Sequence, residues 1–170
     1  MALRSIRLYG DPALREKAER VEEIDDEVRE IARDMLETLE DADGVGLAGP
    51  QVAIARRIIV VHPPAPDRDE VREPARILVN PEIVEKAGPV TGAEEGCLSV
   101  PGIYETVKRP ERVRVQALDL DGRDIHLEAN GILSRILQHE IDHLDGVLFV
   151  DRIGPMRRAL LKKKLQAFLE

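Results

Sequence analysis

Apolar residues recur at helical spacing in three segments of the chain. Residues 25–41 repeat apolar positions every three or four residues, and Asp25 at their start is a good N-cap. Residues 131–144 carry a wider apolar surface, which indicates a helix buried on most of its sides. Residues 155–169 gather leucines and a phenylalanine on one face. The pattern therefore predicts an N-terminal helix, a central buried helix and a C-terminal helix.

Segments that favour extended structure lie mainly between the first two of these helices. The short predicted strands are residues 58–61, 77–79, 83–84, 90–100 and 147–150. Residues 113–120 alternate apolar and charged positions, Asp121-Gly122 favours a tight turn, and residues 125–129 continue on the other side. This last pattern predicts an antiparallel hairpin.

The segment after the first helix is rich in residues that end helices. Gly44, Gly46, Gly49 and Pro50 predict a loop there. No repeat, low-complexity tract or linker divides the sequence, so we expect one domain over residues 1–170. The expected fold class is α+β, with antiparallel and mixed β-sheets packed around the central buried helix.

The charge of the chain limits its partners. The net charge is -8, so the overall field does not favour DNA or an anionic membrane surface. Arg4 and Arg7 interrupt the only short apolar stretch near the amino terminus, and no run is long enough to span a membrane. We expect a cytoplasmic protein and a monomer, with no DNA or membrane partner.

The strongest chemical signal is the run His139-Glu140-Ile141-Asp142-His143 in the predicted central helix. Two imidazoles four residues apart project from one helical face and can bind one metal ion, while Glu140 can address a water on that ion. The alternative is a pair of surface or hydrogen-bonded core histidines.

A catalytic tetrahedral site needs a third protein ligand and keeps its fourth position for water. Cys97 is the only cysteine, which excludes an internal disulfide and leaves an inert buried thiol or an active one. We expect a strand that brings this thiol to the site, entered through Gly96 and left through Pro101. His62 and His126 are the less attractive candidates.

Residues 44–51 form a third unusual segment. Their glycines allow the backbone to approach a ligand closely, and Gln51 can donate an amide hydrogen bond. A plain glycine-rich turn is the alternative. The segment matches neither the P-loop nor the dinucleotide-binding pattern, which argues against phosphate binding.

Together these three segments resemble the signature motifs of the peptide deformylase family. They read GVGLAGPQ at residues 44–51, EGCLS at 95–99 and HEIDH at 139–143. The similarity extends to residues 9–12 and 143–149, and so over nearly the whole chain; it departs at Gly49, where the family usually carries alanine. The resemblance implies hydrolytic removal of the formyl group from the N-terminal formylmethionine of newly made proteins, with release of formate.

The resemblance also implies a role for each matching residue. Cys97, His139 and His143 would bind one divalent ion, most often Fe(II) in cells, with Zn, Ni or Co able to use the same ligands. Glu140 would take a proton from a metal-activated water and return it to the departing amine. Gln51, through its side chain, and Leu98, through its backbone N–H, would stabilise the oxyanion.

Substrate binding is implied for a second set of residues. Gly46 would contact the peptide backbone, and Val45 and Ile136 would line the methionine pocket unless they are plain core residues. Glu95 and Gly96 of the second motif complete the expected substrate-binding set.

Two further charged features need an explanation. A carboxylate on an apolar helix is costly unless it is paired, and we expect Asp142 to pair with Arg109. The alternative is an aspartate that faces solvent. The C-terminal helix carries a basic cluster on an otherwise acidic protein, which suggests contact with ribosomal RNA unless it is a solvated face. The cluster is Arg157, Arg158, Lys162, Lys163 and Lys164.

Two other functions fit part of the pattern. A zinc peptidase also uses HExxH, but it usually takes its third ligand downstream of the helix, and here the best candidate lies upstream. A structural metal or redox-sensing site usually has four protein ligands, and only three convincing ones are present.

Overall fold

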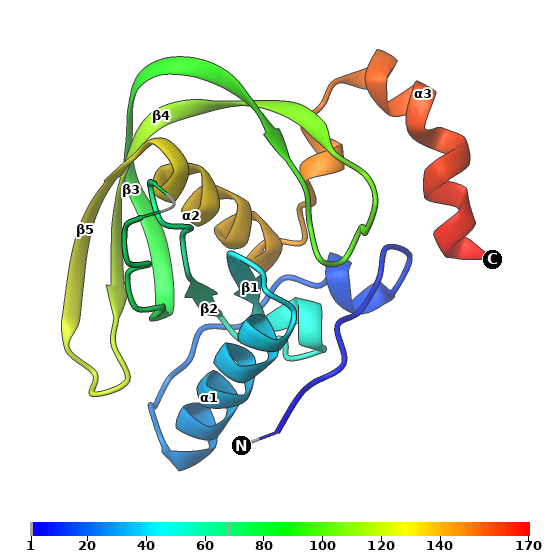
Figure 1. The fold of residues 1–170 in the computed structure, drawn as a ribbon. Helices are drawn as coiled ribbons and strands as arrows, with labels where there is room; N and C mark the ends of the chain where they lie inside the picture. Colours follow the sequence, from blue (N-terminus) through cyan, green and yellow to red (C-terminus); the bar gives the residue numbers. More distant parts are fainter. Residues whose placement is uncertain (1, 68) are drawn as a thin grey trace.

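The computed structural model describes residues 2–67 and 69–170 (Figure 1). Its helices are α1 (Asp26–Asp41), α2 (Gly131–Leu144) and α3 (Pro155–Gln166), with 3-10 helices η1 (Pro12–Arg15), η2 (Gly49–Val52), η3 (Phe149–Asp151) and η4 (Ala167–Leu169). Its strands are β1 (Gly46–Ala48), β2 (Ile58–Val61), β3 (Arg76–Glu95), β4 (Glu105–Leu118) and β5 (Asp124–Asn130). They form one sheet in the order β1-β2-β3-β4-β5, and each neighbouring pair is antiparallel.

This arrangement confirms the predicted α+β class. Helix α2 packs against the sheet and lies at the centre of the molecule in Figure 1, while α3 lies at the periphery. The prediction also included mixed sheets. Within the described residues, parallel pairing amounts to one isolated bridge between Glu19 and Arg56.

Helix α1 begins where its cap residue predicted. The Asp25 side chain accepts a hydrogen bond from the backbone N–H of Val28 at 2.9 Å, which satisfies one of the free amides of the first turn. Met35 and Leu39 on the inner face are fully buried, and they pack in one cluster with Leu47 of β1. The apolar periodicity therefore identified both the helix and its buried face.

Strand β3 replaces three of the predicted strands by one continuous element. Its register with β4 shifts at three places, and such bulges bend a strand and increase its twist. The β3–β4 pair consequently arches over α2 in Figure 1. Strand β3 ends at Glu95, so Cys97 lies after the strand and not within it as predicted.

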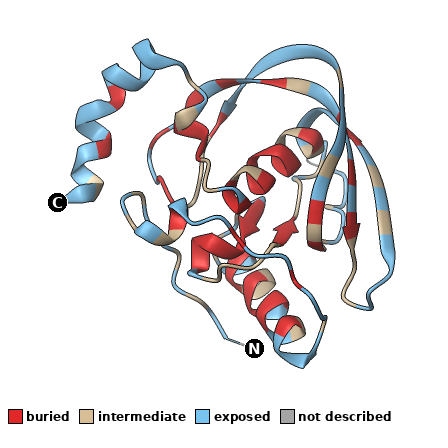
Figure 2. Ribbon diagram, turned by 180° about the vertical axis from the view of Figure 1, so that it is seen from behind, coloured by how far each residue is buried: buried red, intermediate tan, exposed pale blue. Residues whose placement is uncertain are grey.

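The hairpin predicted from the alternating pattern is present as β4 and β5. Val113 pairs with Ala129 and Ala117 with Ile125. The inner side chains of this hairpin pack in one cluster with Leu137 of α2. Figure 2 shows α2 as a largely buried helix, as its wide apolar surface indicated.

Two predicted segments differ in the structure. The strand predicted at residues 147–150 is wrong: Leu148 and Phe149 are buried in a cluster with Leu14, and the chain turns into η3, where Asp151 accepts a hydrogen bond from Leu148 N–H at 2.9 Å. The loop predicted after α1 contains β1, in which Gly46 pairs with Val61 of β2. Tertiary pairing here overrides the weak strand preference of glycine.

Helix α3 is attached along one narrow face. Leu161 and Leu165 are buried, Phe168 packs beside them as predicted, and most of the remaining helix is exposed (Figure 2). The regular helix ends at Gln166 and continues as η4. None of the helices in residues 2–67 and 69–170 combines the length and the hydropathy that a membrane span requires.

Candidate active site

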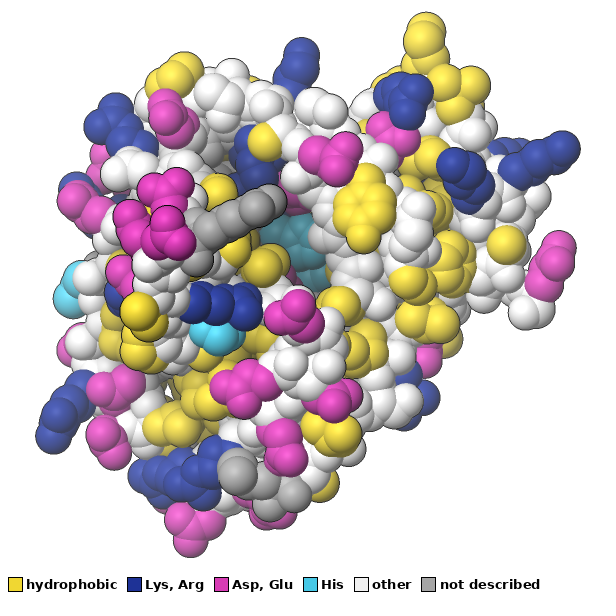
Figure 3. Space-filling view, viewed as in Figure 1, with side chains coloured by type: hydrophobic (Ala, Val, Ile, Leu, Met, Phe, Trp, Pro, Cys, Tyr) yellow, Lys and Arg dark blue, Asp and Glu magenta, His cyan; other side chains and the backbone are white. Residues whose placement is uncertain are grey.

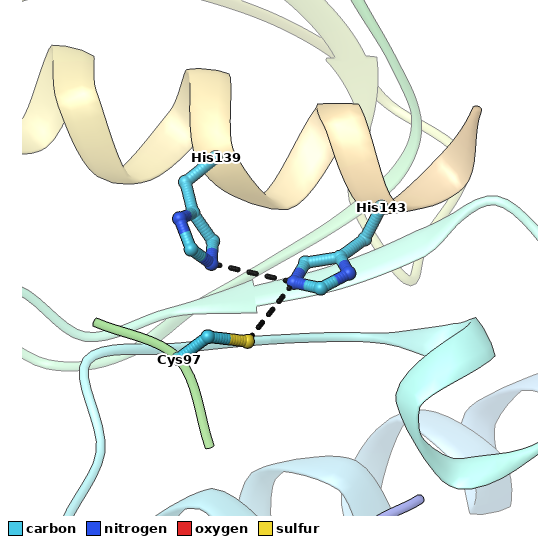
Figure 4. A group of neighbouring side chains, drawn as sticks. All are labelled: Cys97, His139 and His143. Atoms are coloured by element: carbon cyan, nitrogen blue, oxygen red, sulfur yellow. Dashed lines mark hydrogen bonds between the residues drawn. The ribbon is translucent and has the colours of Figure 1, made fainter. Parts of the chain in front are cut away.

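Three candidate metal ligands converge between α2 and the turn after β3 (Figure 4). Cys97 Sγ lies 3.4 Å from His143 Nε2, which lies 3.3 Å from His139 Nε2. All three donor atoms are within 4.8 Å of one another. The structure thus brings together the thiol and the two imidazoles singled out in the sequence, whereas His62 and His126 are not part of the group.

The donor set fits a divalent transition metal. An ion about 2.0–2.1 Å from each nitrogen and about 2.3 Å from sulfur in tetrahedral geometry would hold its donor atoms roughly 3.3–3.6 Å apart. The separations of 3.4 Å from sulfur to nitrogen and 3.3 Å between the nitrogens agree with this range. His139 Nδ1 also lies 3.0 Å from Glu95 Oε1, so the carboxylate orients the ring and turns Nε2 toward the group.

The two histidines differ in their affinity for protons. Burial acts to lower the pKa of His139, but the charge of Glu140 and hydrogen bonds with Cys97 and Glu95 outweigh it and raise the pKa well above its usual value. Burial and the nearby His139 lower the pKa of His143 well below its usual value. A cation bound between the two rings would therefore compete with the proton that His139 favours.

Glu140 lies beside the ligand group and is almost fully buried, with 3% of its surface exposed. Its Oε1 has no hydrogen-bond partner in the described part of the protein. Burial raises the pKa of Glu140 to about 7, although the nearby His139 opposes this shift. A carboxylate with such a pKa can both accept and donate a proton near neutral pH.

Gly46 of β1 makes room for this carboxylate. A Cβ atom at Gly46 would overlap the Glu140 carboxylate, so the two elements can approach this closely only because the residue is glycine. The close approach places a backbone segment of the first motif directly against the acid of the third.

Glu95 anchors a buried ionic network behind the site. It accepts hydrogen bonds from Arg109 at 2.6 and 3.0 Å and from Arg135 at 2.7 Å, besides its contact with His139. Burial alone would raise the pKa of Glu95, but the hydrogen bonds and charges of His139 and Arg109 lower it to about 2. The carboxylate is therefore ionised and held rigidly against the ring of His139.

Asp142 extends this network further along α2, because Arg109 also contacts its carboxylate. Arg109 Nη1 donates to Asp142 Oδ2 at 3.0 Å, which confirms the pair expected from the sequence. Arg152 donates to the same carboxylate at 2.6 and 2.8 Å. The ligand helix is thereby fastened to β4 and to the segment after α2. No local sequence pattern indicates Arg135 or Arg152, because their partners Glu95 and Asp142 lie 40 and 10 residues away along the chain.

Gln51 of η2 is oriented by hydrogen bonds at both ends of its amide. Its Oε1 accepts from Ala48 N–H at 2.9 Å, and its Nε2 donates to Ser99 Oγ at 3.0 Å. The same nitrogen lies 3.5 Å from Cys97 Sγ. The amide donor is therefore fixed beside the ligand group, with Ser99 as a positioning partner that the sequence analysis missed.

A cavity of about 710 Å³ opens onto these residues. Its wall includes every residue predicted for the site except His143, which is 1% exposed. Those wall residues are Val45, Gly46, Gln51, Glu95, Gly96, Cys97, Leu98, Ile136, His139 and Glu140. Figure 3 shows the hollow near the centre of the molecule, with histidine atoms inside it and hydrophobic side chains around it.

The substrate-binding candidates occupy different positions in this wall. Val45 is 41% exposed at the rim, while Ile136 is buried deeper, at 7% exposure. Gly96 lies against the ring of Tyr104, which a Cβ atom at this position would overlap. Glu95 lines the cavity, but its carboxylate oxygens are engaged by His139, Arg109 and Arg135.

Comparison with known proteins identifies the family of this chain. The family model for polypeptide deformylase matches residues 3–159. The peptide deformylase of Thermomicrobium roseum is 54% identical over 155 residues, which cover 90% of this chain and 87% of that protein. A Synechococcus elongatus peptide deformylase crystallised with actinonin has a TM-score of 0.85 at 45% identity, over 95% of this chain and 87% of that one.

A second solved structure carries a peptide. It is the class I type b peptide deformylase of Acinetobacter baumannii bound to Met-Ala-Ser, with a TM-score of 0.83 and 37% identity over 89% of this chain and 98% of that one. These matches span nearly the whole chain, and the family model includes all three sequence motifs. The chain therefore belongs to the polypeptide deformylase family.

Proposed function

We propose that Cys97, His139 and His143 hold one divalent metal ion and that Glu140 transfers the proton during hydrolysis of an N-formyl amide. As a member of its family, the protein is a metal-dependent hydrolase that removes the formyl group from nascent polypeptides. The observation that carries the assignment of residues is the convergence of one thiol and two imidazoles beside a buried carboxylate.

The chemistry divides between the ion and the protein. A divalent ion held by this ligand set supplies Lewis acidity, which polarises an amide carbonyl and lowers the pKa of water. Glu140 accepts the proton of the attacking water and passes it to the amine as the bond from the formyl carbon to nitrogen breaks. A pKa of about 7, raised by burial, suits a group that must do both, although a nearby cation would lower it.

The developing oxyanion needs donors that are already in position. The Gln51 amide, held by Ala48 and Ser99, can donate to it, and we assign the second donor to the backbone N–H of Leu98. Loss of one such donor typically lowers the rate by about 10²- to 10³-fold.

The cavity suits a peptide that begins with methionine. Val45 and Ile136 supply apolar surface for the methionine side chain, and Gly46 and Gly96 allow close approach of the peptide backbone. The Met-Ala-Ser ligand of the Acinetobacter baumannii enzyme is the product such a substrate would leave. The contribution that we assign to Glu95 is indirect, through the ring of His139.

We propose Fe(II) as the physiological metal, with Zn, Ni or Co able to occupy the same ligands. Affinity alone ranks zinc above ferrous iron, so the supply of metal decides. An iron enzyme with a thiolate ligand loses activity in air as metal and sulfur oxidise. Anaerobically purified protein that keeps full activity after prolonged aeration would exclude iron.

The basic cluster on α3 is proposed to contact ribosomal RNA. The ion pairs of this helix reduce the number of its basic residues that are available for that contact. Arg157 is paired with Glu105 and Arg158 with Asp151, which leaves Lys162, Lys163 and Lys164 as the proposed contact. Reversing these three lysines to glutamate should abolish ribosome co-sedimentation at low salt, whereas Arg158→Ala should preserve it. Unchanged co-sedimentation of the triple variant would exclude the contact. A cytoplasmic monomer remains part of the proposal.

A formate-release assay tests the proposed function. Wild-type enzyme should release formate from formyl-Met-Ala-Ser and should not cleave an internal peptide bond, as a zinc peptidase would. Glu140→Gln should lose about 10²- to 10⁴-fold in kcat while keeping its metal, because only proton transfer is removed. Wild-type rates in this variant would refute the role of Glu140, and absence of formate release from the metal-loaded wild type would refute the function.

A further inference from the structure

Arg72 fastens together two segments that are far apart in sequence. It lies in the connection between β2 and β3, at residues 62–75, which carries none of the three motifs. Its Nη2 donates to the backbone carbonyls of Gly44 at 2.9 Å and His62 at 2.5 Å, and its Nε donates to the carbonyl of Pro63 at 3.1 Å. One guanidinium thus satisfies three main-chain acceptors.

The two fastened segments form one side of the cavity rim. Gly44 and Val45 lead from α1 into β1, and Pro64 follows β2; all three line the cavity. A backbone hydrogen bond of 2.7 Å from His62 N–H to Val45 carbonyl joins the segments directly beside the Arg72 contacts. Arg72 therefore lies at the place where the rim would open if the two chain segments separated.

The rim is coupled to the groups assigned to the reaction. A Cβ atom at Gly44 would lie 2.9 Å from Leu98 Cδ1, and one at Gly46 would overlap the Glu140 carboxylate. A displacement of residues 44–46 must therefore change the approach of a peptide to Leu98 and Glu140. A 1 Å shift in position is large on the scale that matters for a bound substrate.

An ion pair does not account for this arrangement. The carboxylate of Asp43 is 3.8 Å from Arg72 Nη1 and its side chain is 95% exposed, and such surface pairs contribute little. The guanidinium fork, in contrast, presents several donors in a fixed plane, which lysine cannot reproduce. The contacts of Arg72 with the three backbone carbonyls therefore depend on the planar geometry of its donors.

We propose that Arg72 is a positioning residue for peptide binding: it holds residues 44–46 against residues 62–64 and so sets the width of the cleft that receives the formylated peptide. The proposal rests on the proposed function. It assigns no contact between Arg72 and the substrate, and it leaves the metal ligands untouched.

Steady-state kinetics with formyl-Met-Ala-Ser test this role. Arg72→Ala should raise KM about 5- to 10-fold and leave kcat within about two-fold of wild type, because binding geometry is lost and the reacting groups remain. Arg72→Lys should recover only part of the loss. Arg76→Ala is the matched control, since within residues 2–67 and 69–170 the Arg76 side chain makes one exposed ion pair, with Glu73 at 3.9 Å.

Hydrogen exchange supplies a readout that does not depend on activity. The His62 amide, which bonds to Val45 carbonyl, should exchange faster in Arg72→Ala than in wild type, with metal content and Tm close to the control. Unchanged KM and unchanged His62 exchange would overturn the proposal, as would an equal rise in KM in Arg76→Ala or a loss of kcat that follows loss of metal. If wild type released no formate, the proposed function would fail, while the exchange result would still report on the fastening itself.

Discussion

Adding a single methyl group at Gly46 should disable the enzyme without unfolding it. A Cβ atom built at Gly46 comes within 2.8 Å of Glu140 Cδ and 2.9 Å of its Cγ. Carbon atoms pack at about 3.5–4.0 Å, so the Glu140 side chain must retreat by roughly 1 Å. The backbone of Gly46 is not left-handed, so alanine suits the strand itself. The three atoms nearest to the added Cβ all belong to the Glu140 side chain.

The expected size of the effect follows from this displacement. A catalytic group moved by about 1 Å can cost about 10²-fold in rate, so kcat of Gly46→Ala should fall to about 1% of wild type. KM should change little, and the free energy of unfolding should stay within about 1 kcal/mol of wild type. The substitution is thus expected to lower kcat strongly while the free energy of unfolding changes little.

Formate release from formyl-Met-Ala-Ser, with metal content measured on the same samples, provides the assay. Gly92→Ala in β3 is the control, because its Cβ would meet only Thr106 Cγ2 at 3.0 Å and Lys108 Cγ at 4.0 Å. The double variant Gly46→Ala/Glu140→Gln should be no slower than Glu140→Gln alone, since both changes act on one group. A wild-type kcat in Gly46→Ala would refute the reasoning, and a defect confined to KM would assign Gly46 to peptide binding only.

Three stability predictions follow from the buried charges and the helix cap. Arg109→Met should lower the free energy of unfolding in urea by about 3 kcal/mol, because its carboxylate partners stay buried with one cation fewer; a loss below about 1 kcal/mol would contradict this. Burial acts to raise the pKa of Asp34, but hydrogen bonds from a backbone amide and from Arg4 outweigh it and lower the pKa. The loss of unfolding free energy in Asp34→Asn should therefore be full above about pH 5 and should shrink as the pH falls below about 4. A loss that does not depend on pH would argue against the shift. Asp25→Ala should cost about 1 kcal/mol through loss of the α1 cap, and an unchanged Tm would exclude that contribution.

The elements with a strong local pattern were predictable from the sequence. Helix α1 has both a cap residue and a regular apolar face, and the β4–β5 hairpin combines alternation with a turn dipeptide. Residues 147–150 were predicted wrongly because their apolar side chains are buried by distant partners such as Leu14 and Leu161, which local preference cannot reveal. Strand β1 was missed because its glycine serves a close approach to Glu140.

The residues of the candidate site that lie in the three motifs were predictable from the sequence, but the residues that support them were not. Their spacing on one helix indicated His139 and His143 as metal ligands. Cys97 was indicated because the sequence offers few other candidates for a third ligand. The supporting groups, Arg135 on Glu95 and Arg72 on the cavity rim, depend on how β3 bends and how a connection folds back. No local pattern encodes either contact, so only the structure reveals them.

X-ray absorption spectroscopy on anaerobically prepared protein tests the central assignment most directly. Metal bound at one equivalent should show one sulfur ligand at about 2.3 Å and nitrogen ligands at about 2.0–2.1 Å, and the sulfur contribution should vanish in Cys97→Ser. A coordination shell without sulfur, or one that is the same in wild type and in Cys97→Ser, would contradict a site built from Cys97, His139 and His143.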